Sequence, residues 1–453
     1  MLTRIYDFVD EGLGHSSYLI DIGDGTTAIV DPPRFPSAHE TLTLRLKSQI
    51  AWTFDTHSHA DYVTGSPGLA ARVGATFIAP AASHLETPHR PLFDGDYIEL
   101  GDNLSMMAIA TPGHTTDHHA YILQQSSDPI ALFSGGSLMV GAVGRTDLCG
   151  PELTESLAHD MFRSLRRFDD LPDDLPVYPT HGAGSFCSAP GASERITTLG
   201  HERGKNPLFK ITDEDRFVEQ LLAGFGTFPS YFTRLPELNR MGPNNYNTIP
   251  PLAQLDPAQV ERHLDLGGAV IDVRPAAAFA AGHLAGSMSN ALRPVFASWL
   301  GWLIKPDQPI VFVLDDDQDR AELVRQCLDI GHERLVGELA FGIKNWTASD
   351  RTHERIEKID IVNPAGMVGL IVDVRQANEY KAGHVPSAIN IELGAISRAE
   401  IPEGALTIMC GHGERAMTGA SILAQRGHTD LVVLDGGPET WSAATRTPLV
   451  TEQ

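Results

Sequence analysis

Asp55-Thr56-His57-Ser58-His59-Ala60-Asp61-Tyr62 follows an apolar run that is typical of a β-strand. Two imidazoles two residues apart, with a carboxylate two residues further on, can converge on one metal ion from a single loop. Neutral imidazole binds zinc, iron and copper, whereas carboxylates favour harder ions. Two later histidines stand beside turn residues, in Thr111-Pro112-Gly113-His114 and in Thr180-His181-Gly182. Together the three segments predict a loop-built site with a metal-binding origin.

Length and composition set the broad class of the protein. At about 150 residues per domain, a chain of 453 residues is expected to hold about three domains. The formal net charge of -24 disfavours a nucleic-acid partner, because the phosphates would be repelled. There is neither an apolar run of about 18 residues nor an apolar signal segment at the start. Four scattered cysteines, at positions 149, 187, 327 and 410, favour a reducing compartment, so we expect a cytoplasmic protein with no membrane contact.

Strand-like and helix-like runs alternate along residues 1–205, with polar residues at the strand ends. This pattern predicts a layered α/β domain. Helices are expected over 37–49 and 65–73. The expected strands cover 17–20, 27–31, 50–54, 76–79, 105–110, 121–123 and 130–133.

Residues 1–205 resemble the metallo-β-lactamase superfamily, and within it the persulfide dioxygenases and, more distantly, glyoxalase II. The resemblance rests on the three histidine segments above and on Gly144-Arg145-Thr146-Asp147. It implies an αββα sandwich. In persulfide dioxygenases one iron is held by two histidines and by the aspartate of a Phe-Thr-Gly-Asp motif. The two histidines correspond here to His57 and His114.

The aspartate does not carry over. The segment reads Phe133-Ser134-Gly135-Gly136, so Gly136 stands where the family has the ligand, and Tyr62 stands where dinuclear relatives have a histidine. Three alternatives stay open. The domain is a metal-free scaffold, or it holds a metal more weakly through His57, His114 and a neighbour such as His59, or an outside anion or water completes an iron site. Zinc is the alternative metal, and an aspartate at position 136 is expected to raise iron occupancy.

The resemblance further implies that Arg145, Asp147 and His181 border the substrate pocket. An ion pair between Arg145 and Asp147 that only fixes the loop is an equal alternative. Cys187 follows the His181 loop, but no helix start or basic residue adjoins it, so we expect it to pack rather than to relay sulfur.

A connecting extension over 206–255 is too aromatic for a flexible linker, and an internal repeat follows it. Two pairs of segments match at an offset of 101 residues (373 − 272 and 384 − 283). They are Val270-Ile271-Asp272-Val273-Arg274 with Ile371-Val372-Asp373-Val374-Arg375, and Ala281-Gly282-His283 with Ala382-Gly383-His384. Each repeat alternates strands and helices, which predicts a parallel sheet. The motifs resemble the rhodanese family and divide the rest of the chain into domains 256–350 and 357–453.

The second repeat carries the nucleophile. A buried-type strand leads into Cys410-Gly411-His412-Gly413-Glu414-Arg415, and a helix is expected from Ala416. Backbone N–H groups of such a loop and the helix dipole stabilise a thiolate and suit a bound persulfide, and Arg415 can present its guanidinium to an anion. The first repeat has Asp315 at the position of Cys410, so we expect it to be catalytically silent.

The sequence therefore resembles fusions of a persulfide dioxygenase with rhodanese domains. The resemblance implies that Cys410 carries sulfane sulfur as a persulfide between a thiol persulfide such as glutathione persulfide, sulfite and thiosulfate. Iron-dependent oxidation of a persulfide to sulfite at the first domain is the lesser expectation. The alternatives are a hydrolase of the glyoxalase II kind and a sulfur-binding or sensing protein with a metal-free scaffold. A homo-oligomer is also expected.

Overall fold

The computed structural model describes residues 4–182, 184–187, 194–348, 356–357 and 359–452. Contacts group the chain into two compact units. The first holds Met1–Thr248 with Leu328–Gly331, and the second holds Ile249–Cys327 with His332–Gln453. The boundary expected between the two repeats, at 350–357, falls largely outside the described residues. No helix within the described ranges is long and apolar enough to cross a membrane.

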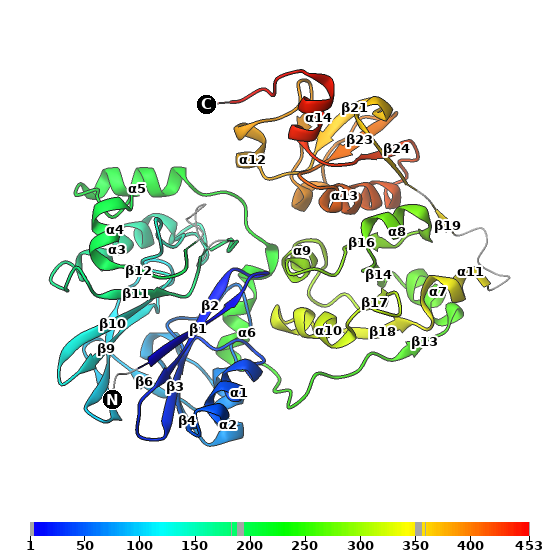
Figure 1. Ribbon diagram of the computed structural model, residues 1–453. Helices are drawn as coiled ribbons and strands as arrows, with labels where there is room; N and C mark the ends of the chain where they lie inside the picture. Colours follow the sequence, from blue (N-terminus) through cyan, green and yellow to red (C-terminus); the bar gives the residue numbers. More distant parts are fainter. Residues whose placement is uncertain (1–3, 183, 188–193, 349–355, 358, 453) are drawn as a thin grey trace. The chain divides into compact units, whose positions relative to one another are not determined.

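Two six-stranded sheets form the centre of the first unit (Figure 1). One runs in the order β1-β2-β3-β4-β5-β6, antiparallel up to β3 and parallel beyond it. The other runs β12-β11-β10-β9-β8-β7 and is antiparallel except where β10 pairs with β11. The strands are β1 Arg4–Asp10, β2 His15–Asp21, β3 Thr26–Val30, β4 Gln49–Phe54, β5 Thr76–Pro80, β6 Arg90–Leu92, β7 Tyr97–Gly101, β8 Leu104–Ala110, β9 His119–Gln125, β10 Asp128–Gly135, β11 Pro176–Pro179 and β12 Thr197–Thr198.

Alternating side chains build the layers of this unit. Tyr18 and Ile20 of β2 point into the core between the two sheets, whereas Leu19 between them packs under the outer helices. Helices α1 and α2 cover the first sheet, and α3, α4 and α5 cover the second. These helices, with α6, are α1 Ser37–Arg45, α2 Ser66–Val73, α3 Thr154–Arg166, α4 Leu199–Lys205, α5 Glu214–Ala223 and α6 Leu235–Met241. The predicted αββα sandwich is confirmed.

The helix expected over 37–49 ends earlier. It stops at Arg45, Lys47 takes a left-handed conformation with φ 58°, and β4 begins at Gln49. A left-handed non-glycine residue ends a helix as a terminal turn does, and the polar residues around it gave no sign of the break.

The second unit contains two five-stranded parallel sheets with the same strand permutation, β13-β18-β17-β14-β16 and β20-β24-β23-β21-β22. Every strand pair within them is parallel, which confirms the predicted repeat. The strands are β13 Gln254–Leu255, β14 Ala269–Asp272, β16 Met288–Ser289, β17 Ile310–Val313, β18 Leu335–Leu339, β20 Asp360–Val362, β21 Leu370–Asp373, β22 Ile389–Asn390, β23 Leu406–Met409 and β24 Leu431–Leu434. A two-stranded antiparallel ladder joins β15 His283–Leu284 to β19 Ile356–Glu357.

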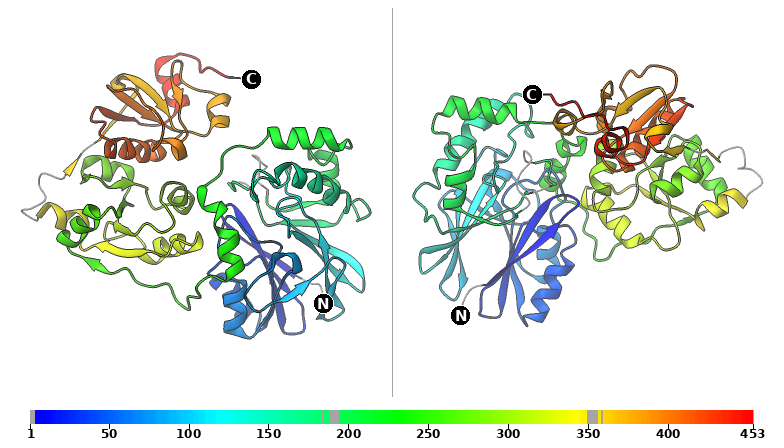
Figure 2. Two further views of the ribbon diagram at one scale, coloured as in Figure 1. Left: turned by 180° about the vertical axis from the view of Figure 1, so that it is seen from behind. Right: turned by 45° about the horizontal axis from the view of Figure 1, so that its top comes forward.

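Helices pack around these sheets in both repeats (Figure 2). They are α7 Pro257–Asp265, α8 Ala276–Ala281, α9 Phe296–Leu303, α10 Arg320–Asp329, α11 Gly342–Ala348, α12 Ala377–Ala382, α13 Glu414–Gln425 and α14 Pro438–Thr445. In each repeat, arginine pairs with the aspartate two residues before it, as the structural ion-pair interpretation predicted. Arg274 and Arg375 each also donate to a carbonyl oxygen eight residues further on.

Candidate functional site

Three buried histidines converge in the first unit. His57 follows β4, His114 follows β8 and His181 follows β11. One ring nitrogen from each lies within 4.8 Å of the others. Parallel pairing of β10 with β11 sets Gly135 opposite Pro179, and this non-local pairing delivers His181 to the cluster. Sequence interpretation assigned His181 to the substrate pocket, whereas the structure brings it beside the two expected ligands.

Hydrogen bonds fix the tautomers of two of these rings. The Nδ1 of His114 lies 2.8 Å from the carbonyl oxygen of Arg145, which can only accept, so the proton is on Nδ1. His57 Nδ1 lies 2.8 Å from Thr56 Oγ1, and that hydroxyl in turn donates to the Asp31 carboxylate at 2.9 Å. His57 therefore also carries its proton on Nδ1. Both rings present a bare Nε2, the arrangement that metal-binding histidines adopt.

The third ring has a carboxylate neighbour in place of an aligned hydrogen bond. His181 Nδ1 lies 3.2 Å from Asp61 Oδ2 without hydrogen-bond alignment, and the negative charge favours a proton on Nδ1. His181 Nε2 then faces His57 Nε2 at 3.3 Å. Two lone pairs at that distance repel unless a cation lies between them, and two ligands of a tetrahedral zinc ion stand about 3.3 Å apart. His114 Nε2 is buried and has no hydrogen-bond partner among the described residues.

The electrostatics of the cluster suit a metal ion. Burial lowers the pKa of His57 well below its ordinary value and lowers that of His114 to about 3, so both rings are neutral ligands. The Asp61 carboxylate beside His181 keeps its negative charge, because the interaction with His181 outweighs burial and lowers the pKa of Asp61. The residues present therefore fit a metal held by three imidazoles with one carboxylate behind them.

His59 is committed elsewhere. Its Nε2 lies 3.1 Å from Asp31 Oδ1 and 3.1 Å from the Tyr62 hydroxyl, which itself donates to the Asp31 carbonyl oxygen. Burial alone would lower the pKa of His59, but the charge of Asp31 outweighs it and raises the pKa to about 9. A protonated, ion-paired imidazole is not a ligand. The role of third ligand, which the sequence offered to His59, fits His181 better in this structure.

Two glycines form a slot for the His114 ring. A Cβ added to Gly136 would lie 2.3 Å from His114 Cδ2, and one added to Gly144 would lie 2.7 Å from His114 Nδ1. Such distances are far below van der Waals contact, so neither position accepts a side chain while the ring stays in place. Gly136 is therefore more than a lost ligand, because its missing side chain makes room for the ring.

We expect Gly136→Asp to lower stability by about 1–3 kcal/mol and to lower metal occupancy, because the new side chain must displace the His114 ring. This replaces the expectation from sequence that the aspartate would restore iron. Thermal unfolding and elemental analysis of the purified variant measure both effects. Gly204→Ala is the matched control, since nothing lies within 4 Å of a Cβ at that helical glycine. Iron content above that of the wild type would contradict the expectation.

Arg145 and Asp147 form a buried loop anchor. The guanidinium Nε and one terminal nitrogen donate to the two Asp147 oxygens at 2.6 and 2.8 Å, and other donors reach the carbonyl oxygens of Phe186 and Gly226. The cation also lies 4.5 Å from the ring centre of Phe228. These contacts occupy the donors that a substrate would need. The structure thus favours the ion-pair alternative, and a pocket role for this pair stays a prediction.

Asn239 of α6 is a positioning residue that sequence interpretation missed. Its amide nitrogen donates to the carbonyl oxygens of His59 and Tyr62 at 2.9 and 3.0 Å, and its Oδ1 accepts from the Thr64 amide. The side chain is buried. Asn239 therefore holds the loop that carries His59 in place, although it stands at least 175 residues later in the sequence. The sequence gave little signal for this role, because Asn239 stands among other polar residues, with Glu237 and Arg240 on the same helix.

Cys187 is fully buried near the histidine cluster. Burial raises the pKa of its thiol well above the ordinary value, and the nearby Asp61 carboxylate adds to that effect. A neutral, enclosed thiol is a poor nucleophile. The structure supports the packing role that was expected for Cys187.

Cys410 lies in the second unit, directly after β23. It is 1% exposed, and the Gly413 amide donates to its Sγ at 3.1 Å. Helix α13 begins at Glu414, two residues before the predicted start, so its N-terminus lies closer to the sulfur than expected. Gly413 precedes the helix with φ 102°, a conformation that glycine adopts at little cost. Gly411 and His412 lie in this loop and Glu414 begins the helix, and their role in a cradle for a persulfide stays a prediction.

Arg415 is held by a neighbour on α12. Its two terminal nitrogens donate to the two Glu379 oxygens at 2.6 and 2.8 Å. Burial alone would raise the pKa of Glu379, but the hydrogen bonds from Arg415 outweigh it and keep the pKa below its ordinary value. The guanidinium therefore clamps the loop to α12 in this structure. A direct catalytic role for Arg415 stays a prediction.

The corresponding loop of the first repeat is closed by its own arginine. One terminal nitrogen of Arg320 donates to the carbonyl oxygens of Asp315, Asp316 and Gln318, and its Nε donates to Glu338. β17 ends at Val313, which pairs with Asp272 as Met409 pairs with Asp373, so Leu314 takes the place of Cys410 in the first repeat. The expectation from sequence that Asp315 stands there is wrong by one residue, because the two loops before the arginines differ in length by one residue. This loop has carboxylates and no thiol that could act as a nucleophile. That the first repeat takes no sulfur itself therefore stays a prediction.

Comparisons with known proteins match both parts of the chain. The family described as rhodanese-like domain matches residues 256–349 and 351–444. A hydroxyacylglutathione hydrolase of Methylobacterium sp. (strain 4-46) is 30% identical over 223 residues, which cover 43% of this chain and 81% of that protein. A solved structure titled metallo-beta-lactamase, from Staphylococcus aureus, is 26% identical, covers 75% of this chain and 99% of its own, and has a TM-score of 0.65. The structure of ETHE1 from Myxococcus xanthus is 27% identical, covers 53% and 98%, and has a TM-score of 0.46.

Proposed function

This chain belongs, through its first part, to the metallo-β-lactamase-fold family of the hydroxyacylglutathione hydrolases, and two rhodanese-like domains follow that part. On that premise we propose that the protein is a sulfurtransferase and that Cys410 is the nucleophile that carries the sulfur. The observation that carries the proposal is the position of the Cys410 sulfur, at a strand end below the α13 N-terminus with the Gly413 amide donating to it. The second rhodanese-like match spans this loop.

The transfer needs no oxidant or reductant. The Cys410 thiolate attacks the outer sulfur of thiosulfate, one S–S bond forms as the other breaks, and sulfite leaves with the electron pair. An acceptor thiolate then attacks the outer sulfur of the Cys410 persulfide, forms its own persulfide and returns Cys410 as the thiolate. Amide N–H groups at a helix N-terminus favour the anionic sulfur at each stage.

The test is direct. The intact protein is incubated with thiosulfate labelled at the outer sulfur, and the mass and label of Cys410 are then measured before and after addition of glutathione. We expect one labelled sulfur on Cys410 and its release as glutathione persulfide. No label on Cys410 with thiosulfate or with a thiol persulfide would contradict the proposal.

For the first domain we propose metal-dependent oxidation of a low-molecular-weight thiol persulfide to sulfite, and of the candidate metals we favour iron. When bound, the metal would supply Lewis acidity and dioxygen activation. His57, His114 and His181 would hold it, and Asp61 would orient His181. The balanced reaction takes one persulfide, one dioxygen and one water to a thiol, sulfite and two protons. Iron analysis combined with oxygen uptake on glutathione persulfide tests the proposal.

A thioester hydrolase is the second candidate, because the related proteins are named hydroxyacylglutathione hydrolases. It would need a metal-bound hydroxide, which dinuclear relatives make with further ligands. His59, Asp61 and His181 also lie close enough to form a second group, but the ion pair of His59 with Asp31 and the Tyr62 hydroxyl both engage the His59 ring. Hydrolysis of S-D-lactoylglutathione without oxygen uptake would favour this candidate, and a metal-free protein with neither activity would favour a scaffold.

A further inference from the structure

A pocket of about 370 Å³ within the second unit borders the Cys410 loop. His412, Gly413 and Glu414 of the second repeat line one side of it, and Arg293 and Gln318 of the first repeat line the other. A substrate that reaches Cys410 through this pocket therefore meets both repeats. The volume is enough for a small oxyanion with its sulfur, such as thiosulfate.

Few cations near this pocket are free. Arg415 is held by Glu379, and Arg375 is held by Asp373 and the Gly383 carbonyl oxygen. Gln318 is also engaged at both ends, because its amide nitrogen donates to Val273 and its oxygen accepts from Asp315. One of the two amide hydrogens of Gln318 is thus already used, and the side chain carries no charge to offer an anion.

Arg293 differs from all of these. Its guanidinium has no hydrogen bond or ion pair with any described residue, and its Nε is buried without a partner. Burial lowers the pKa of Arg293, while the nearby Glu414 carboxylate and Cys410 sulfur raise it, so the side chain lies within electrostatic reach of the nucleophile. Arginine keeps its charge under such shifts. A half-buried cation beside a nucleophile, with no ion-pair partner among the described residues, calls for an anionic partner.

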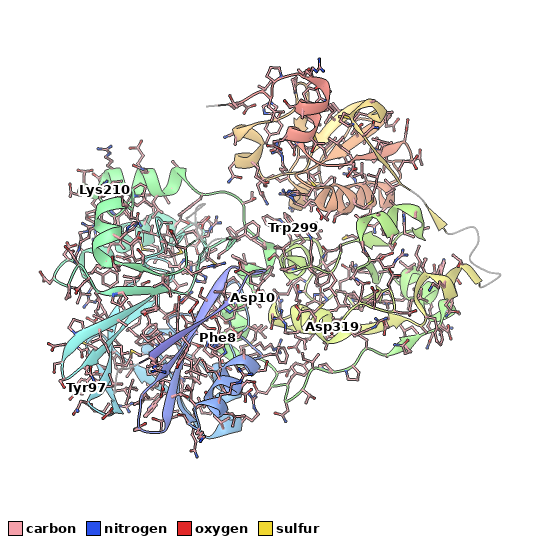
Figure 3. All side chains as sticks on the ribbon, viewed as in Figure 1. Phe8, Asp10, Tyr97, Lys210, Trp299 and Asp319 are labelled. Atoms are coloured by element: carbon pink, nitrogen blue, oxygen red, sulfur yellow. The ribbon has the colours of Figure 1, made fainter. Side chains whose placement is uncertain are left out.

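Contacts inside the unit hold Arg293 beside the second repeat. Its segment joins β16 to α9, and α13, the helix that follows Cys410, packs on β16 (Figures 1 and 2). The Ser289 amide of β16 donates to Ser421 Oγ at 3.1 Å, and Gln425 donates to the Gly286 carbonyl oxygen at 2.9 Å. Trp299 of α9, labelled in Figure 3, places its ring 5.8 Å from the Arg415 guanidinium.

We propose that Arg293, supplied by the repeat that lacks a nucleophile, is the specificity-determining residue that binds the sulfonate oxygens of a dianionic sulfur donor, thiosulfate or its leaving group sulfite. The inference rests on the proposed sulfurtransferase function. A planar guanidinium can donate two parallel hydrogen bonds to two sulfonate oxygens while Cys410 attacks the outer sulfur. The same cation offsets the Glu414 carboxylate, which would otherwise repel the donor, and stabilises sulfite as it leaves.

The first repeat thus acquires a role in the chemistry although Leu314 stands where the second repeat has its cysteine. The equivalent position of the second repeat is Gly394, which follows from the offset of 101 residues (394 − 293), so the two copies have no common cation here. Because Arg293 comes from the first repeat and Cys410 from the second, binding of the sulfur donor requires both repeats in one chain.

The experiment compares two donors in the full-length protein. Arg293→Gln should raise the KM for thiosulfate about 10–100-fold, because a charge-assisted contact to a dianion is lost. The KM for the persulfide of 2-mercaptoethanol, which has no sulfonate, should change less than about twofold. Sulfite should protect Cys410 from iodoacetamide in the wild type and fail to do so in Arg293→Gln. Arg293→Lys should recover part of the thiosulfate affinity, since it keeps the charge without the planar pair of donors.

Arg262→Gln is the matched control, because Arg262 is an exposed arginine on α7 of the same repeat and does not line the pocket. An unchanged KM for thiosulfate in Arg293→Gln would overturn the inference, as would an equal rise for both donors. If Arg293→Gln does not fold, Arg293→Lys with full wild-type affinity and intact sulfite protection would contradict the need for a planar contact. A wild type that takes sulfur from neither donor would overturn the proposed function, and this inference with it.

Discussion

Cys410→Ser should lose sulfur transfer by at least about 1,000-fold, because a hydroxyl at neutral pH cannot replace a thiolate as the nucleophile or carry sulfane sulfur. Serine is the informative substitution, since its oxygen can still accept the Gly413 amide hydrogen bond that the sulfur accepts at 3.1 Å. The loop should therefore keep its shape while the chemistry disappears. The measurement is labelled sulfur transferred from thiosulfate to glutathione, with thermal unfolding as the check on folding.

The matched control for this prediction is Cys149→Ser, a half-buried cysteine of the first unit. It removes one thiol and should leave the transfer rate unchanged. Metal content should be the same in both variants, because neither cysteine is one of the residues that would hold the metal. Transfer by Cys410→Ser at more than a few per cent of the wild-type rate would mean that another thiol carries the sulfur.

The position of Cys410 could be predicted from sequence because its determinants are local. A run of apolar residues marks β23, and glycines mark the loop directly after it. The helix start was predicted two residues late, since Glu414 and Arg415 look like loop residues by polarity. A glutamate in the first turn of a helix is favourable, because it faces the positive end of the helix dipole. The first residue of this helix is therefore better predicted by the favourable position of the Glu414 charge than by the polarity of Glu414 and Arg415.

Contacts between distant segments could not be predicted in the same way. Glu379 lies 36 residues before Arg415 and comes from α12, so sequence inspection left the arginine free for an anion. Asn239 reaches the histidine loop from α6, and Arg293 reaches the Cys410 pocket from the other repeat. In each case the sheet topology creates the contact, and the residue type alone suggests several partners. Local periodicity predicts which elements form and does not predict which polar groups remain free.

The histidine cluster shows how a lost ligand alters a site. The sequence showed Gly136 in place of an aspartate and left three alternatives open for the metal. It could not show that the ring of His114 takes the space of the missing side chain, or that β10–β11 pairing brings His181 within 3.3 Å of His57. A neutral third imidazole lowers the negative charge of the site relative to an aspartate. Such a site should bind its metal less tightly than one with a carboxylate ligand.

His181→Gln should therefore lower metal affinity by more than about 100-fold, since replacing even an outer-shell partner of a ligand costs about 10–100-fold. The readout is independent of catalysis. Metal that binds the folded state raises the unfolding temperature, so adding a chelator to the metal-loaded wild type should lower it. In His181→Gln the chelator should have no effect, and elemental analysis should find little metal. His201→Gln, an exposed histidine on α4, is the matched control and should behave as the wild type.

His59→Gln separates the two candidates for the third ligand. It removes the partner of the buried Asp31 carboxylate, so stability should fall by about 3–5 kcal/mol. The three bare Nε2 atoms of the cluster are untouched, and the chelator should still lower the unfolding temperature of the metal-loaded variant. The opposite result would be that the chelator lowers the unfolding temperature of His181→Gln and not that of His59→Gln. In that case His59 would be the third ligand, and its ion pair with Asp31 would have to break when the metal binds. If the chelator lowered the unfolding temperature of both variants, neither His59 nor His181 would be required for binding, and the proposal of a site with three imidazole ligands would be wrong.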